Sequence, residues 1–120
     1  MTTLVLLPTT IFGVPSGNYD GSSTVFFGNA QPAASYYRGQ GTVQTMPIQV
    51  TNLVGNVTIQ ATLNDQHNVD TAWFDIGSYG TANTTTTGTT AITVEGNFVW
   101  LRARVTGFTG GTINSANVIY

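Results

Sequence analysis

The chain has 120 residues, of which 7% are charged, with a formal net charge of -2 at pH 7 and no lysine or cysteine. Near-neutrality without a basic cluster excludes a dedicated nucleic-acid-binding protein. The lack of cysteine excludes a disulfide scaffold, a thiolate metal site and a cysteine nucleophile. A hydrophobic content of 41% argues against disorder, and the length suits one domain with one core.

The N-terminus carries no targeting signal. The apolar run at 4–7 follows no Lys or Arg and ends at Pro8, so it lacks the basic region and the length of a signal peptide. No stretch approaches the ~18 apolar residues of a membrane span. We therefore expect a leaderless, soluble chain without a membrane partner.

The first 40 residues differ in character from the rest. Their β-type runs at 9–12 and 24–27 are short, and Pro8, Pro15, Pro32 and several glycines interrupt them. This segment predicts an N-terminal arm or hairpin. It either belongs to the same domain or docks on a neighbouring molecule, and the pattern leaves both open.

Residues 41–120 predict an all-β fold, a single antiparallel β-sandwich of jelly-roll or immunoglobulin-like topology. The clearest strand is Val57–Leu63, where apolar and polar residues alternate. We expect further strands at 72–76, 91–95, 98–108 and 112–120, turns at 77–80, 96–97 and 110–111, and a polar edge or loop tip at 84–87. The expected core residues are Val57, Ile59, Leu63, Val99, Leu101, Val105 and Ile119.

The run from Phe98 to Val105 predicts a strand with two unlike faces. Its aliphatic residues form a core stripe, while Phe98, Trp100, Arg102 and Arg104 alternate rings and guanidinium groups on the other face. One interpretation is a contact surface, because rings and arginines are enriched at protein interfaces. The other is packing within the sheet, with each arginine lying over a ring and pairing with Glu95 or Asp75. Tyr36, Tyr37 and Arg38 form a second cluster of this kind.

Metal binding and catalysis are weakly indicated. The segment 65–70 gathers two aspartates, His67 and two amides, but a polar loop that caps its own backbone explains it as well. His67 is the only histidine and Glu95 the only glutamate, and no nucleophile elbow is present. We expect no enzyme, no metal and no cofactor.

The stretch from Gly96 through Val105, continuing through 110–113 to 118–120, resembles the closing strands of small β-rich virion structural proteins of tailed bacteriophages, notably those of cyanophages. Asn56–Leu63 followed by Trp73 fits the same pattern. The resemblance covers roughly the last 65 residues. It implies a non-enzymatic particle component made in the bacterial cytoplasm: a capsid decoration or cement protein, or a small fibre or neck subunit.

Two functions therefore remain open. The first is a capsid decoration protein in the virion, which binds other virion proteins and forms homo-oligomers through the N-terminal arm and the Trp100, Arg102 and Arg104 face. The second is a carbohydrate- or receptor-binding module of a phage fibre or tail, with Trp73, Tyr79 and Trp100 as stacking platforms.

Overall fold

The chain folds into one antiparallel sheet of eight strands, and the predicted all-β class is confirmed. The computed structural model describes residues 3–33, 43–64, 72–81, 83–96 and 98–120. The strands are β1 (Thr3–Leu7), β2 (Thr10–Ile11), β3 (Phe26–Phe27), β4 (Gln31–Pro32), β5 (Val43–Thr62), β6 (Trp73–Tyr79), β7 (Thr86–Glu95) and β8 (Trp100–Ile119). No helix in the described residues has the length and apolar character needed to cross a membrane.

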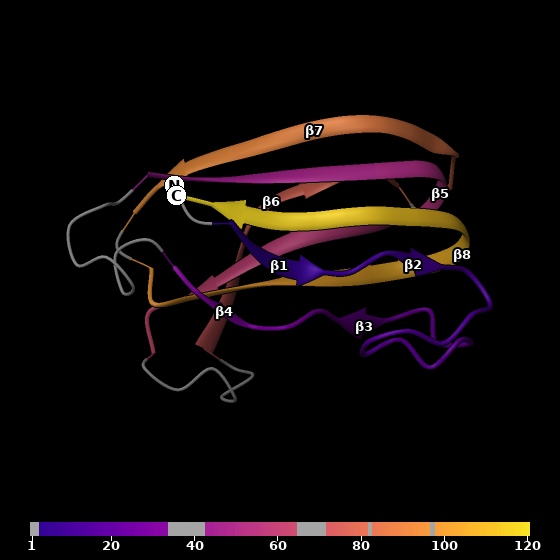
Figure 1. Ribbon diagram of the computed structural model, residues 1–120, viewed down its shortest axis with the longest axis horizontal. Coiled ribbons are helices and arrows are strands. Elements are labelled where there is room, and N and C mark those ends of the chain that lie inside the picture. Colours follow the sequence, from indigo (N-terminus) through magenta and orange to yellow (C-terminus); the bar gives the residue numbers. More distant parts are fainter. Residues whose placement is uncertain (1–2, 34–42, 65–71, 82, 97) are drawn as a thin grey trace.

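Two strands of 20 residues, β5 and β8, form the centre of the sheet and pair with each other along most of their length. Both bend near the middle, at the end of the molecule where β2 lies (Figure 1). The bend lets a single sheet fold back on itself, so that its two halves stack as the layers of a sandwich. Layer one contains β7, residues 43–53, residues 110–119, β1 and β2. Layer two contains β6, residues 56–62, residues 100–106, β3 and β4.

The bend occurs where two residues have a positive φ, a backbone conformation that residues with a side chain rarely adopt. Asn52 has a φ of 50° and Gly111 a φ of 85°, and these residues lie against each other across β5 and β8. A Cβ on Gly111 would lie 2.0 Å from the Asn52 carbonyl oxygen. The β5–β8 register also shifts between Thr51 and Val54 and again before Asn56. Such β-bulges increase twist and let a strand turn a corner.

One side of the sandwich is closed by the N-terminal segment. Asn29 donates its backbone N–H to the Leu6 carbonyl at 2.8 Å, and the Gln31 side chain donates to the Val5 carbonyl at 2.9 Å. These bonds join the outer edge of β1 in layer one to the segment that leads into β4 in layer two. The described residues form no such connection on the other side of the sandwich, where β6 is the edge of layer two and β7 the edge of layer one.

The core lies between the layers and draws on every part of the chain. Its fully buried members include Leu6 and Tyr19 from the first third, Ile48 and Ile59 from the two halves of β5, and Phe108 from β8. At the open side, Gly77 of β6 allows the layers to approach, because a Cβ there would lie 2.8 Å from Ile92 Cγ2 of β7.

The described part of the first third is tied to the sheet rather than extended away from it. Strands β1 to β4 all pair with β8, and the rings of Tyr19, Phe26 and Phe108 pack together. The loop after Tyr19 is held by Asp20, whose carboxylate accepts bonds from Ser22 and Ser23. The backbone N–H groups of these serines lower the pKa of Asp20 to about 2.

Two of the predicted turns were wrong. Gly77–Tyr79 continues β6 instead of forming a turn, because each of its residues pairs with β5. Gly110 and Gly111 bend β8 but do not end it. In both cases pairing with a long neighbouring strand outweighs the local preference of Gly for a turn. Of the two interpretations of 84–87, the polar edge holds for Thr86 and Thr87, which belong to the edge strand β7.

Three of the seven expected core residues are not buried. Leu63 is 64% exposed because β5 ends at Thr62, whose hydroxyl bonds the Ala72 carbonyl and the Asn64 N–H as the chain turns away. Ile119 is only partly buried because a register shift between Ile113 and Ser115 reverses the alternation, so that Ala116 and Val118 face the core instead. Val99 precedes β8 and is partly buried.

Candidate functional site

The candidate site is the outer face of layer two. On this face Thr58 lies opposite Arg104, Gln60 opposite Arg102 and Thr62 opposite Trp100, in three successive pairs of β5 and β8. Phe27 of β3 and Trp73 of β6 flank the two long strands. Successive residues of a strand point to opposite faces, so the aliphatic residues between these positions face the core.

Arg102 is enclosed by two aromatic rings. Its guanidinium carbon lies 4.1 Å from the centroid of the Phe27 ring and 4.3 Å from that of the Trp73 ring. Its Nε donates to Gln60 Oε1 at 2.8 Å, and the residue is only 8% exposed. A cation held between two rings gains ~0.5–2 kcal/mol from each ring. Arg102 is therefore part of the structure of this face.

A short polar relay joins Arg102 to the acidic side chain on β6. The Gln60 amide receives the Arg102 N–H on its oxygen and donates its own Nε2–H to Asp75 Oδ1 at 2.9 Å. Gln60 is 7% exposed, so both ends of its amide need partners. Gln60 thus links Arg102 to Asp75, one of the two carboxylates that the sequence offered as a direct arginine partner.

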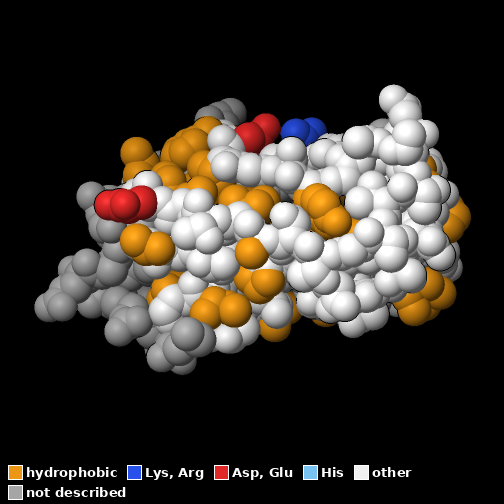
Figure 2. Space-filling view, turned by 90° about the horizontal axis from the view of Figure 1, so that it is seen from above, with side chains coloured by type: hydrophobic (Ala, Val, Ile, Leu, Met, Phe, Trp, Pro, Cys, Tyr) orange, Lys and Arg blue, Asp and Glu red, His pale blue; other side chains and the backbone are white. Residues whose placement is uncertain are grey.

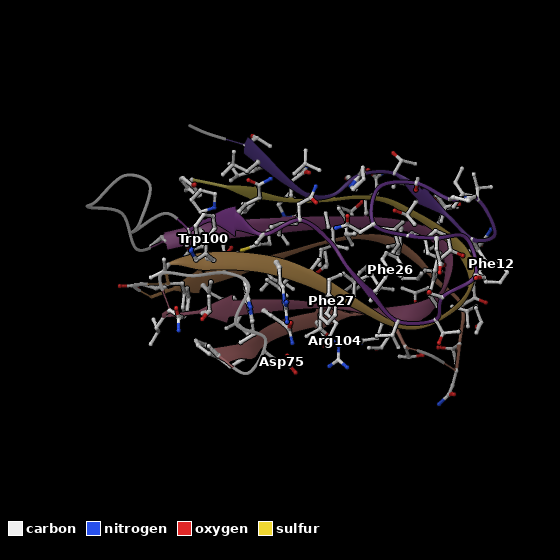
Figure 3. All side chains as sticks on the ribbon, turned by 90° about the horizontal axis from the view of Figure 1, so that it is seen from below. Phe12, Phe26, Phe27, Asp75, Trp100 and Arg104 are labelled. Atoms are coloured by element: carbon white, nitrogen blue, oxygen red, sulfur yellow. The ribbon has the colours of Figure 1, made fainter. Side chains whose placement is uncertain are left out.

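Arg104 lies two residues further along the same face and has a different environment. Its guanidinium carbon is 6.0 Å from the Phe27 ring, and its buried Nε has no hydrogen-bond partner in the described part of the chain. No ion pair of Arg104 with any described carboxylate is formed. Figure 3 places Phe27, Arg104 and Asp75 on the same side of the molecule, and Figure 2 shows an arginine next to an acidic side chain along its upper edge.

Of the other two described contact residues, Trp100 lies on this face and Phe98 does not. Trp100 is partly buried and pairs with Thr62 and Pro32 at the start of β8. Phe98 precedes the strand, packs against the core and contacts the Phe74 ring at 5.9 Å. The three predicted stacking platforms do not share one surface: Trp73 faces outward over Arg102, whereas Tyr79 packs against the core on the other face of β6.

Several predicted residues lie outside the described part of the chain. They are Tyr36, Tyr37, Arg38, Asn97 and the polar segment 65–70 with His67. Among the residues that are described, no group of three or more His, Cys, Asp or Glu side chains is placed to hold a metal ion.

Two members of the site were not singled out from the sequence. Gln60 was expected to face water in an alternating strand, and nothing local indicates that Arg102 and Asp75 cover it. Phe27 could have been identified from the sequence, because Phe26 and Phe27 are adjacent aromatic residues in a predicted strand. Only one of two adjacent strand residues can enter the core. Phe26 is 6% exposed and Phe27 is 37% exposed.

A second exposed apolar group, the apolar tip, consists of Ile11, Phe12 and Val14. Their exposed fractions are 46%, 44% and 50%. A backbone bridge joins Ile11 to Val14, and the Phe12 ring contacts Phe108 edge-on at 5.7 Å. Figure 3 shows Phe12 at one end of the molecule, away from Trp100.

Comparison of the chain with protein-family models and with curated protein sequences gives no match.

Proposed function

We propose that this chain is a non-enzymatic virion structural protein, a capsid decoration protein that binds the particle surface through protein–protein contacts. The observation that carries the proposal is the state of Arg104. A buried guanidinium N–H without an acceptor costs about 1–3 kcal/mol. Because Arg104 as a whole is only partly buried, its side chain can turn outward and donate to acceptors on a partner, which recovers this cost. Arg104 lies beside a partly exposed phenylalanine, and this pairing of residue types is enriched at protein interfaces.

The surrounding surface supports a protein partner. The chain has 22 threonines and no lysine, and threonine loses less side-chain entropy than lysine when an interface orders it. The apolar tip adds exposed area of the kind that subunit contacts bury. On a symmetric particle, many copies multiply a modest contact free energy.

The glycan-binding alternative has less support from the geometry. Stacking on a sugar needs an open ring face, and Arg102 covers one face of Trp73. Tyr79 points toward the core and shares no surface with Trp73. A common platform of the kind expected from the sequence is therefore not formed by these two rings.

The test is cosedimentation of the purified chain with expanded heads of the phage that encodes it. Arg104→Met keeps an apolar stem on the sheet and removes the donors, so we expect binding at least about tenfold weaker. Gln49→Met, on the outer face of layer one, is the matched control and keeps full binding.

Three results would overturn the proposal. They are the absence of binding to heads, binding that Arg104→Met leaves unchanged, and specific binding of the wild-type chain to an oligosaccharide on a glycan array with no binding to heads.

A further inference from the structure

Strand β7 is an open sheet edge. Nine of its ten residues pair with β5, and no other described strand pairs with it. In Figure 1 it forms the upper border of the sheet. The opposite border of the same layer differs, because the outer carbonyl groups of Val5 and Leu6 in β1 accept bonds from Gln31 and Asn29. Within the described residues, the chain therefore covers one edge of layer one and places no strand against the other edge.

β7 also lacks the features that usually prevent an edge from pairing. Edge strands are commonly protected by lysine, proline, inward charges or bulges. The sequence of β7 contains no Lys, Arg or Pro, and its only charge is Glu95 at the last position. Its register with β5 is unbroken from Glu95 to Gly88. By contrast β6, the edge of layer two, carries Asp75 and a register shift beside it.

We propose that β7 pairs antiparallel with β7 of a second copy of this chain, so that layer one continues across a two-fold axis. This inference concerns a different surface from the Arg104 face and does not depend on the proposed function. A donor strand from another protein is the alternative occupant.

The sequence of β7 suits pairing with itself. Residues 86–94 are uncharged, and an antiparallel arrangement places the two Glu95 side chains at opposite ends of the joint, so no like charges meet. The outward side chains, which include Thr89 and Ala91, are exposed, and the inward ones, which include Ile92, are half-buried. If the register places the outward residues of one β7 opposite those of the other, the inward apolar residues of the two copies also lie opposite each other. The Thr45–Thr93 hydroxyl contact at 3.1 Å shows that threonines on this face pair across strands.

The first experiment measures the mass of the full chain by sedimentation equilibrium over a wide range of concentration. We expect association to twice the 12.7 kDa of one chain. Thr89→Lys places a charge on the edge, where the second copy brings another, and should weaken the dimer at least about tenfold. Ala91→Lys is a second variant with the same expected effect. Gln49→Lys is the matched control, because Gln49 lies directly opposite Thr89 but on the inner strand β5.

The second experiment is amide hydrogen exchange at low and high concentration. In a strand that pairs on one side, alternate N–H groups point to the unpaired side. We expect those of β7 to exchange fast in the monomer and to become protected as the dimer forms. The proposal is overturned by a chain that stays monomeric, by a dimer that Thr89→Lys leaves as stable as Gln49→Lys does, or by β7 amides that stay unprotected in the dimer.

Discussion

At the residue scale, two arginines of one strand face have different roles. Arg102 and Arg104 are separated by one residue and project from the same side of β8. Arg102 has rings on both sides and an acceptor for its Nε, whereas the Nε of Arg104 has no acceptor in the described residues. The difference arises from the neighbouring strands: Gln60 and Trp73 meet at Arg102, while Thr58 lies opposite Arg104. Packing thus accounts for Arg102, whereas the described residues supply no acceptor for the Nε of Arg104.

This difference predicts unequal effects of truncation. Arg102→Ala removes two ring contacts and leaves the Gln60 oxygen without its donor, so the free energy of unfolding should fall by about 2–3 kcal/mol. Arg102→Lys should restore only part of the loss, because an ammonium lacks the flat surface that stacks between rings. Urea unfolding monitored by tryptophan fluorescence measures both.

The matched control is Arg104→Ala, for which we expect no loss of stability, because removal of the unpaired N–H relieves its desolvation cost and offsets the lost packing of the side-chain stem. A loss at Arg104 as large as that at Arg102 would contradict the assignment of one arginine to the fold and the other to contact.

At the scale of elements, β5 and β8 are the strands that make the sandwich. Each supplies a pairing strand to both layers, and the bend between their halves depends on tight backbone contact rather than on a loop. The contact is closest where Gly111 meets the carbonyl group of Asn52, both at positive φ. A bend of this kind needs a residue without a Cβ.

Gly111→Ala should therefore destabilise the fold strongly. The added Cβ meets backbone atoms at 2.0 and 2.4 Å and imposes a disfavoured φ, so the free energy of unfolding should fall by at least about 2 kcal/mol. Thermal unfolding followed by circular dichroism measures the loss.

Gly110→Ala is the adjacent control. Its Cβ would meet only the Val54 side chain, at 3.7 Å, which is an ordinary contact. We expect little change there, and equal losses at the two glycines would show that the bend does not depend on the Gly111 backbone.

At the scale of the whole molecule, the first third of the chain is integrated with the rest. Four of its side chains are nearly fully buried: Leu6, Leu7, Tyr19 and Phe26. The hydrogen bond from the Asn29 N–H to the Leu6 carbonyl closes one side of the sandwich. Burial of four such side chains contributes about 6–12 kcal/mol. That is as large as the whole net stability of an ordinary domain.

Deletion of residues 1–33 should consequently abolish cooperative unfolding, rather than leave a folded sandwich that has lost only its docking arm. Near-ultraviolet circular dichroism and a urea titration of the truncated chain give the readout. A sharp, native-like transition in the truncated chain would show instead that residues 34–120 fold on their own and that the N-terminal segment is an accessory arm.

The strand pattern predicted the all-β class, the inward positions from Val57 to Ala61 and from Leu101 to Val105, and the outward arginines. These features are local, because the alternation of inward and outward positions in a strand can be read from consecutive residues. Of the residues predicted to form one contact surface, Trp100, Arg102 and Arg104 share a face, but Phe98 packs against the core. Of the predicted stacking rings, Tyr79 lies on the other side of its strand from Trp73.

Other features could be read only from the tertiary structure, because they depend on pairing between strands that lie far apart in the sequence. The bulges that bury Val118 instead of Ile119, the continuation of β8 through two glycines, and the Arg102–Gln60–Asp75 relay all depend on which residue of a remote strand lies opposite. Register is a property of two strands, and a shift of one residue exchanges the faces of everything that follows. The near absence of charge was evident from composition alone. Its arrangement follows only from how the sheet folds over: Arg102 is enclosed by two rings, Arg104 is partly exposed, and β7, with a single charge, forms an edge of the described sheet.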